Sequence, residues 1–159
     1  MANNEVNAGF VIFRNPDGAI LFETDNRTPS KLTLPGGGVG FAELPIDSVP
    51  REVHEELGVT ISRQRLTIVG CFVRRLTYGD VFLFEYNGVR RMHEETFTPD
   101  PSEVTDIRWL KPEEVASLPS DEIYDAQKHL VMHYLNWVNS GRSGFVFDFL
   151  SPPFLTCRS

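Results

Sequence analysis

The sequence has few cysteines, fewer basic than acidic residues and no long apolar runs. Its two cysteines, Cys71 and Cys157, are far apart and fit neither a disulfide framework nor a CxxC metal pair. No apolar run is long enough to span a bilayer. The first ten residues, MANNEVNAGF, lack the basic region and apolar core of a secretory signal. We therefore expect a reducing, cytoplasmic location and no membrane partner.

The charge balance is acidic. The chain carries 15 Lys and Arg residues against 22 Asp and Glu residues, which gives a formal net charge of −7. An acidic surface repels a phosphate backbone, so nucleic acid is disfavoured as a partner. The net charge does not exclude a local basic cleft.

The length and composition predict one globular domain over residues 1–159. The chain has 159 residues, of which 41% are hydrophobic and 23% charged, and it shows no repeat or linker. The segment 144–159 is rich in Phe. We expect this tail to pack back on the domain; the alternatives are a homodimer contact and a substrate lid.

Short runs rich in β-branched and aromatic residues predict strands. These runs are 8–14, 19–23, 65–75, 80–86 and 105–110. A turn at 15–18 (NPDG) predicts that the first two form a hairpin. A short extended segment at 32–34 is broken by the PGGG of 35–38, and the charged loop 87–102 has a length that often indicates function.

Three helices are predicted. The first covers 45–57 and is ended by Gly58. Pro50 is poorly tolerated inside a helix, so a start near Asp47 or Ser48 is preferred. The second covers 112–117, and the third runs from an N-cap at Ser120 to about Asn139.

Three glutamates cluster on the first helix. Glu52, Glu55 and Glu56 have the spacing i, i+3 and i+4, which places three carboxylates on one face. Val49, Val53 and Leu57 lie on another face that can pack against a sheet. Like charges at this spacing repel, and a hard cation such as Mg²⁺ or Mn²⁺ relieves that repulsion. A short ExxEE motif is most often a solvated acidic helix face, so the surrounding residues must decide.

The surrounding residues resemble the Nudix box, G-x5-E-x7-R-E-U-x-E-E-x-G-U, where U is aliphatic. Every fixed position is matched within 23 residues, by Gly37, Glu43, Arg51, Glu52, Val53, Glu55, Glu56, Gly58 and Val59. The opening hairpin, the LPGG entry and the IRWLKPEEV segment also resemble the flanks of the family. Ala42 departs from the pattern, because the family usually has Gly there.

The resemblance implies an α/β/α sandwich around a mixed β-sheet and a metal-dependent hydrolase. The expected reaction cleaves a pyrophosphate bond in a nucleoside diphosphate derivative or a nucleoside triphosphate, with Mg²⁺ or Mn²⁺ as cofactor. It implies metal ligation by Glu52, Glu55, Glu56 and the carbonyl of Gly36. Arg51 and Glu43 would orient these ligands. Glu55 and Glu103 are the candidates for the general base, and Glu94 and Glu95 compete with Glu103 for the role of the downstream glutamate.

The substrate is poorly marked in the sequence. Arg27, Lys31 and Tyr78 are candidates for substrate contacts, although each residue type is more often an ordinary surface or turn residue. The expected partner is a small nucleotide. The rival hypothesis is a non-catalytic Nudix-type module that senses a nucleotide or metabolite. A third, an enzyme that processes RNA ends, needs a basic surface that the net charge of −7 does not indicate.

Overall fold

In the computed structural model, residues 7–26, 30–74, 79–87 and 96–150 are described. The strands form two sheets. The five-stranded sheet has the order β4-β1-β6-β5-β8, and the three-stranded sheet has the order β3-β2-β7. The first contains both parallel and antiparallel pairs, so it is mixed. The strands are β1 (Ala8–Ile12), β2 (Ile20–Asp25), β3 (Leu32–Thr33), β4 (Gly36–Gly38), β5 (Leu66–Val73), β6 (Asp80–Tyr86), β7 (Val104–Leu110) and β8 (Val146–Phe149).

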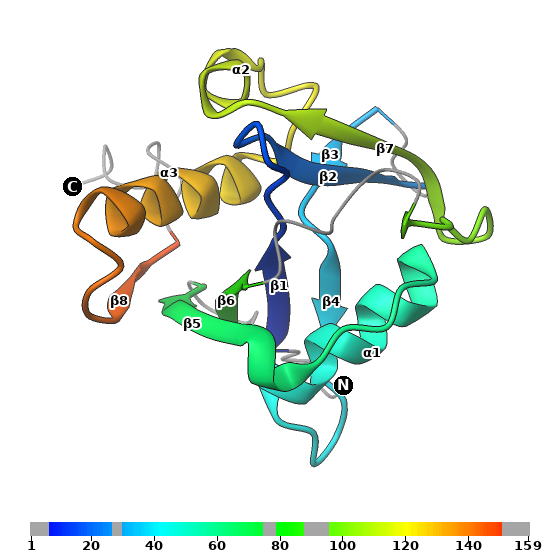
Figure 1. The fold of residues 1–159 in the computed structure, drawn as a ribbon, viewed down its shortest axis with the longest axis horizontal. Helices are drawn as coiled ribbons and strands as arrows, with labels where there is room; N and C mark the ends of the chain where they lie inside the picture. Colours follow the sequence, from blue (N-terminus) through cyan, green and yellow to red (C-terminus); the bar gives the residue numbers. More distant parts are fainter. Residues whose placement is uncertain (1–6, 27–29, 75–78, 88–95, 151–159) are drawn as a thin grey trace.

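Two apolar cores lie on opposite faces of the strands, with a helix on each face (Figure 1). Helix α1 (Pro45–Leu57) packs on the face that presents Val11 and Leu21, while α3 (Asp125–Asn139) packs on the face that presents Ile12 and Ile20. Consecutive residues of one strand thus enter different cores, as the period of two of a strand requires. The short helix α2 (Pro112–Ser117) contacts α3. The predicted mixed α/β fold is confirmed.

The predicted hairpin forms only next to its turn. Gly18 takes a φ of 83° and its N–H donates to the carbonyl of Asn15 (2.9 Å). Arg14 pairs with Ile20 in an isolated antiparallel bridge, and beyond it the two strands enter different sheets. The hairpin prediction was therefore wrong beyond the first pairs. β2 finds a longer partner in β7, with which it pairs from Ile20 to Asp25.

The PGGG segment is also not the break that we expected. Gly36–Gly38 forms β4, which pairs with β1 in antiparallel register. Gly36 has a φ of 142°, and a Cβ atom there would lie 2.1 Å from the carbonyl oxygen of Gly9. Only glycine allows this close approach, so the segment can add a strand at the sheet edge.

Helix α1 begins at Pro45, so the preferred start near Asp47 or Ser48 was wrong. The N–H groups of Asp47 and Ser48 donate to the carbonyl of Leu44, which closes the first turn from that residue. Pro50 lies inside the helix. Packing offsets its missing N–H, because Val49 and Val53 are fully buried. The helix ends at Leu57 with Gly58 left-handed, as predicted.

Helix α3 begins at Asp125 rather than after Ser120. The segment before it is held against β3, because the N–H of Leu32 donates to the carbonyl of Glu122 (2.8 Å) and Leu32 and Ile123 form a parallel bridge. This pairing holds residues out of the helix that a good N-cap would otherwise begin. The predicted helix 112–117 is confirmed as α2.

The described part of the Phe-rich tail packs on the domain. β8 pairs in parallel with β5, and Leu150 is buried. The pairing is close at Gly70, where a Cβ atom would lie 2.3 Å from the carbonyl oxygen of Val146. Residues 151–159, including Cys157, lie outside the described residues. Cys71 is buried in β5, as expected.

Candidate active site

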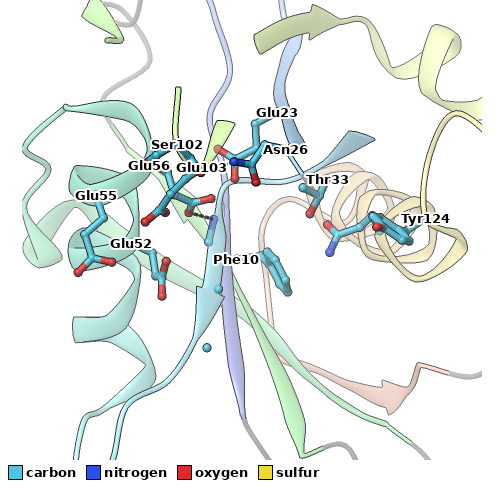
Figure 2. Close-up of a pocket in the computed structure, with 14 residues that line it drawn as sticks. Phe10, Glu23, Asn26, Thr33, Glu52, Glu55, Glu56, Ser102, Glu103 and Tyr124 are labelled. Carbon is cyan, nitrogen blue, oxygen red and sulfur yellow. Dashed lines mark hydrogen bonds between the residues drawn. The ribbon is translucent and has the colours of Figure 1, made fainter. Parts of the chain in front are cut away.

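A cavity of about 670 Å³ opens between α1, β4, β2 and the segment before β7 (Figure 2). Its lining includes five carboxylates, which are Glu23, Glu52, Glu55, Glu56 and Glu103. The aromatic side chains of Phe10 and Tyr124 line it as well, on the side away from the α1 carboxylates. The cavity therefore joins an acidic wall to an aromatic one.

Arg51 lies outside the cavity lining and hydrogen-bonds to carboxylates of the acidic wall. Its guanidinium donates to both carboxylate oxygens of Glu43 (2.9 Å each) and to the carbonyl of Gly38 (2.9 Å). It also donates to Glu52 (3.1 Å) and Glu55 (3.3 Å). This bidentate interaction with Glu43 needs the planar guanidinium group of an arginine. The bond to Arg51 and a second one from the N–H of Gly40 lower the pKa of Glu43 to about 2, so Glu43 stays ionised.

The loop between β4 and α1 brings Glu43 into reach. Ala42 takes a φ of 58°, and the N–H of Gly40 donates to Glu43 (2.8 Å). A left-handed residue is required here, which explains why glycine is usual at this position in the family that the sequence resembles. Glu43 does not line the cavity. Its contacts are those of a residue that holds Arg51 in place.

The three glutamates of α1 differ in how deeply their side chains are buried. Glu56 is 8% exposed and accepts a hydrogen bond from the N–H of Gly36 (3.3 Å). Burial raises its pKa to about 7, and the charges of Glu52 and Glu103 act in the same direction. Burial also raises the pKa of Glu52, while Glu55 is the most exposed of the three. Glu56 is thus the innermost carboxylate of the helix.

The other predicted site residues are placed as follows. Glu103 lines the cavity, and its carbonyl accepts a hydrogen bond from the N–H of Asn26 (3.1 Å). Gly36 lines the cavity too. Lys31 does not line it; its amine lies 5.0 Å from the ring centroid of Tyr124, which does. The candidates Arg27, Tyr78, Glu94 and Glu95 lie outside the described residues.

Sequence reasoning missed several lining residues. These are Phe10, Glu23, Asn26, Thr33, Ser102, Tyr124 and Gln127. Glu23 carried a usable signal, because it is an acidic residue within an otherwise apolar strand, AILFE. An acidic side chain that a strand buries needs a specific partner or a function. Gln127 is buried and accepts a hydrogen bond from the N–H of Leu34 (3.1 Å), so it also supports the segment that enters the cavity.

The chemistry of these donors fits a hard divalent cation. The acidic wall offers carboxylate oxygens, the ligands that Mg²⁺ and Mn²⁺ prefer. Among the described residues, no three acidic, His or Cys side chains are already gathered as a closed ligand set. Arg51 binds Glu52 and Glu55, and ionised carboxylates repel one another unless a cation lies between them. No helix in the described ranges is long and apolar enough to cross a membrane.

In this mixed α/β fold the cavity lies where the carboxylate-rich helix α1 borders the glycine-rich strand β4. The profile of the NUDIX domain family matches residues 4–134, and this chain therefore belongs to the Nudix family. It is a Nudix pyrophosphohydrolase. No curated protein sequence matches the chain.

Solved structures of Nudix proteins share the fold at low sequence identity. A NUDIX hydrolase from Nitrosomonas europaea is 17% identical with a TM-score of 0.71, over 92% of this chain and 78% of that one. A MutT protein from Methanosarcina mazei Go1 is 22% identical with a TM-score of 0.64, over 87% and 96%. An Ap4A hydrolase from C. elegans is 18% identical with a TM-score of 0.61, over 85% and 98%.

The pKa of Glu56 predicts how cation binding depends on pH. If a cation binds Glu56, it has to displace the proton that this carboxyl group holds below about pH 7. The affinity for Mn²⁺ is therefore expected to rise by up to about tenfold per pH unit below pH 7 and to level off above it. Titrations of Mn²⁺ followed by electron paramagnetic resonance between about pH 5.5 and pH 8.5 would measure this.

The raised pKa of Glu56 also determines whether the stability of the fold rises or falls with pH. Glu56 holds its proton more tightly in the folded chain than at its ordinary pKa of 4.5. Without a cation, its contribution to stability is present below pH 4.5 and is lost as pH rises towards 7. Glu56→Gln should remove this loss in thermal unfolding with EDTA. In the titrations of Mn²⁺, an affinity that stays constant across the pH range would contradict a role of Glu56 as a cation ligand.

Proposed function

We propose that this chain hydrolyses a pyrophosphate bond in a nucleoside diphosphate derivative or a nucleoside triphosphate, with Mg²⁺, or alternatively Mn²⁺, as its cofactor. The observation that carries the proposal is the single cavity that joins Glu52, Glu55, Glu56 and Glu103 to the aromatic side chains of Phe10 and Tyr124. The acidic wall suits a cation-bound pyrophosphate. The aromatic wall suits the flat ring of a nucleobase.

In this proposal, Glu52, Glu55, Glu56 and the carbonyl of Gly36 hold the cation. A bound divalent cation neutralises pyrophosphate oxygens and lowers the pKa of water. Arg51 and Glu43 keep the helix carboxylates in place. Glu55 and Glu103 are the candidates for the base that takes a proton from the attacking water, because both line the cavity and carry carboxylates. Tyr124, with Lys31 over its ring, contacts the non-phosphate part of the substrate.

Three further proposals complete the functional assignment. The chain acts in the cytoplasm, its partner is a small nucleotide rather than nucleic acid, and any self-association is a homodimer. The acidic balance of the chain supports the second of these, since a net charge of −7 repels a phosphate backbone.

The test is a turnover panel. It contains nucleoside di- and triphosphates, nucleotide sugars, ADP-ribose and dinucleoside polyphosphates, each with Mg²⁺, with Mn²⁺ and with EDTA. Cleavage of one member that EDTA abolishes, with both products identified by chromatography, would support the hydrolase and identify its substrate class. Saturable binding without cleavage would instead favour the rival function, a nucleotide or metabolite sensor.

A further inference from the structure

Glu23 brings a carboxylate to the cavity from a different part of the fold than α1. It lies on β2, where it pairs with Thr33 of β3 and Ile107 of β7. It lines the cavity and is only 2% exposed. Figure 2 shows it beside Asn26, above the strand that carries Gly36 to Gly38. The three-stranded sheet therefore contributes an acidic group to the same space as the helix.

The carboxyl group of Glu23 faces that of Glu56. The two side chains are within hydrogen-bonding reach of each other, and Glu56 is 8% exposed. Two buried carboxyl groups side by side repel when both are ionised, so they must share a proton or a cation. For a structural contact alone, a neutral amide or hydroxyl would pack at lower cost.

Another buried glutamate shows how this fold satisfies a structural carboxylate. Glu85 on β6 is 8% exposed and accepts hydrogen bonds from Arg142 (2.8 and 3.1 Å) and from the hydroxyl of Tyr134. Glu85 does not line the cavity. Glu23 differs from it because it faces open cavity space and a second acid.

We propose that Glu23 is a fourth carboxylate ligand of the divalent-cation site and binds a cation jointly with Glu56. The inference rests on the proposed function, since it adds a ligand to the site that would serve hydrolysis. The cation would then join β2 of the three-stranded sheet to α1. Cation binding should therefore stabilise the contact between these two elements as well as prepare the site.

The test compares Mn²⁺ binding by the full chain, its Glu23→Gln variant and its Glu85→Gln variant. Gln keeps the shape and removes the charge. We expect Glu23→Gln to weaken the Mn²⁺ Kd, followed by electron paramagnetic resonance, by about tenfold or more. The rise in the thermal unfolding midpoint on adding Mn²⁺ should shrink in parallel. Glu85→Gln, which removes a buried carboxylate that does not line the cavity, should leave the Mn²⁺ Kd unchanged.

Failure of the inference and failure of the proposed function give different results. If the parent chain binds no Mn²⁺, the proposed metal-dependent function fails together with the inference. If the parent binds Mn²⁺ and Glu23→Gln binds it equally well or more tightly, the function stands and Glu23 is not a ligand. A lower midpoint in EDTA with an unchanged Mn²⁺ Kd would show a structural residue and would likewise overturn the inference.

Discussion

Glu56→Gln is expected to lower kcat for metal-dependent hydrolysis by about 10³-fold, equivalent to about 4 kcal/mol of transition-state stabilisation. Glu56 is the innermost carboxylate of α1 and accepts a hydrogen bond from the N–H of Gly36. Gln can still accept that bond. What it cannot supply is the negative charge that, in the proposed function, would hold a cation against the pyrophosphate. The effect should therefore fall on catalysis rather than on folding.

The measurement is kcat with Mg²⁺ for the substrate that the panel identifies. Glu85→Gln is the matched control, because Glu56 and Glu85 are each 8% exposed and only Glu56 lines the cavity. The control removes a buried charge from the network of Arg142 and Tyr134, so it should lower stability and leave kcat of the folded protein unchanged. Full activity of Glu56→Gln would show that the acidic wall is not the metal site.

Local patterns predicted the helix that carries the site. The apolar positions of Val49, Val53 and Leu57 indicate the helix and Gly58 marks its end, because these signals act over one or two turns; the start of the helix was predicted wrongly. The contact of Arg51 with Glu55 follows from the i, i+4 spacing of the helix, and its contact with Glu43 from the short loop before the helix. This part of the site needs no long-range information.

The features that the sequence did not predict depend on pairings between segments that are distant in the chain. Whether Glu23 faces the cavity depends on β2 joining β7 rather than β1, and the turn at Gly18 indicated β1. The start of α3 depends on the bond between Leu32 and Glu122, which competes with the cap at Ser120. The strand in the tail depends on Gly70, which lets Val146 approach. Tertiary contacts decide each of these three outcomes, and local sequence propensities carry no information about such contacts.

Arg51→Lys is expected to lower kcat by about 10- to 100-fold, the range for residues that orient metal ligands. Lysine keeps the charge, but a single ammonium group cannot bind both oxygens of Glu43 and also reach Gly38, Glu52 and Glu55 as the guanidinium does. The helix carboxylates should then lose their common orientation. KM should change less than kcat, because Arg51 does not line the cavity.

An independent readout comes from Glu43, whose pKa of about 2 is caused first by its hydrogen bond from Arg51. In Arg51→Lys, this pKa should rise towards the ordinary value of 4.5, which carboxyl NMR titration would detect. Arg63→Lys is the control, since Arg63 pairs with Asp47 (2.9 Å) outside the cavity and exposed pairs contribute little. A lower kcat with an unchanged Glu43 pKa would show that the loss of activity does not come from the lost hydrogen bonds between Arg51 and Glu43. A raised pKa with full activity would show that Arg51 orients Glu43 without controlling the metal ligands.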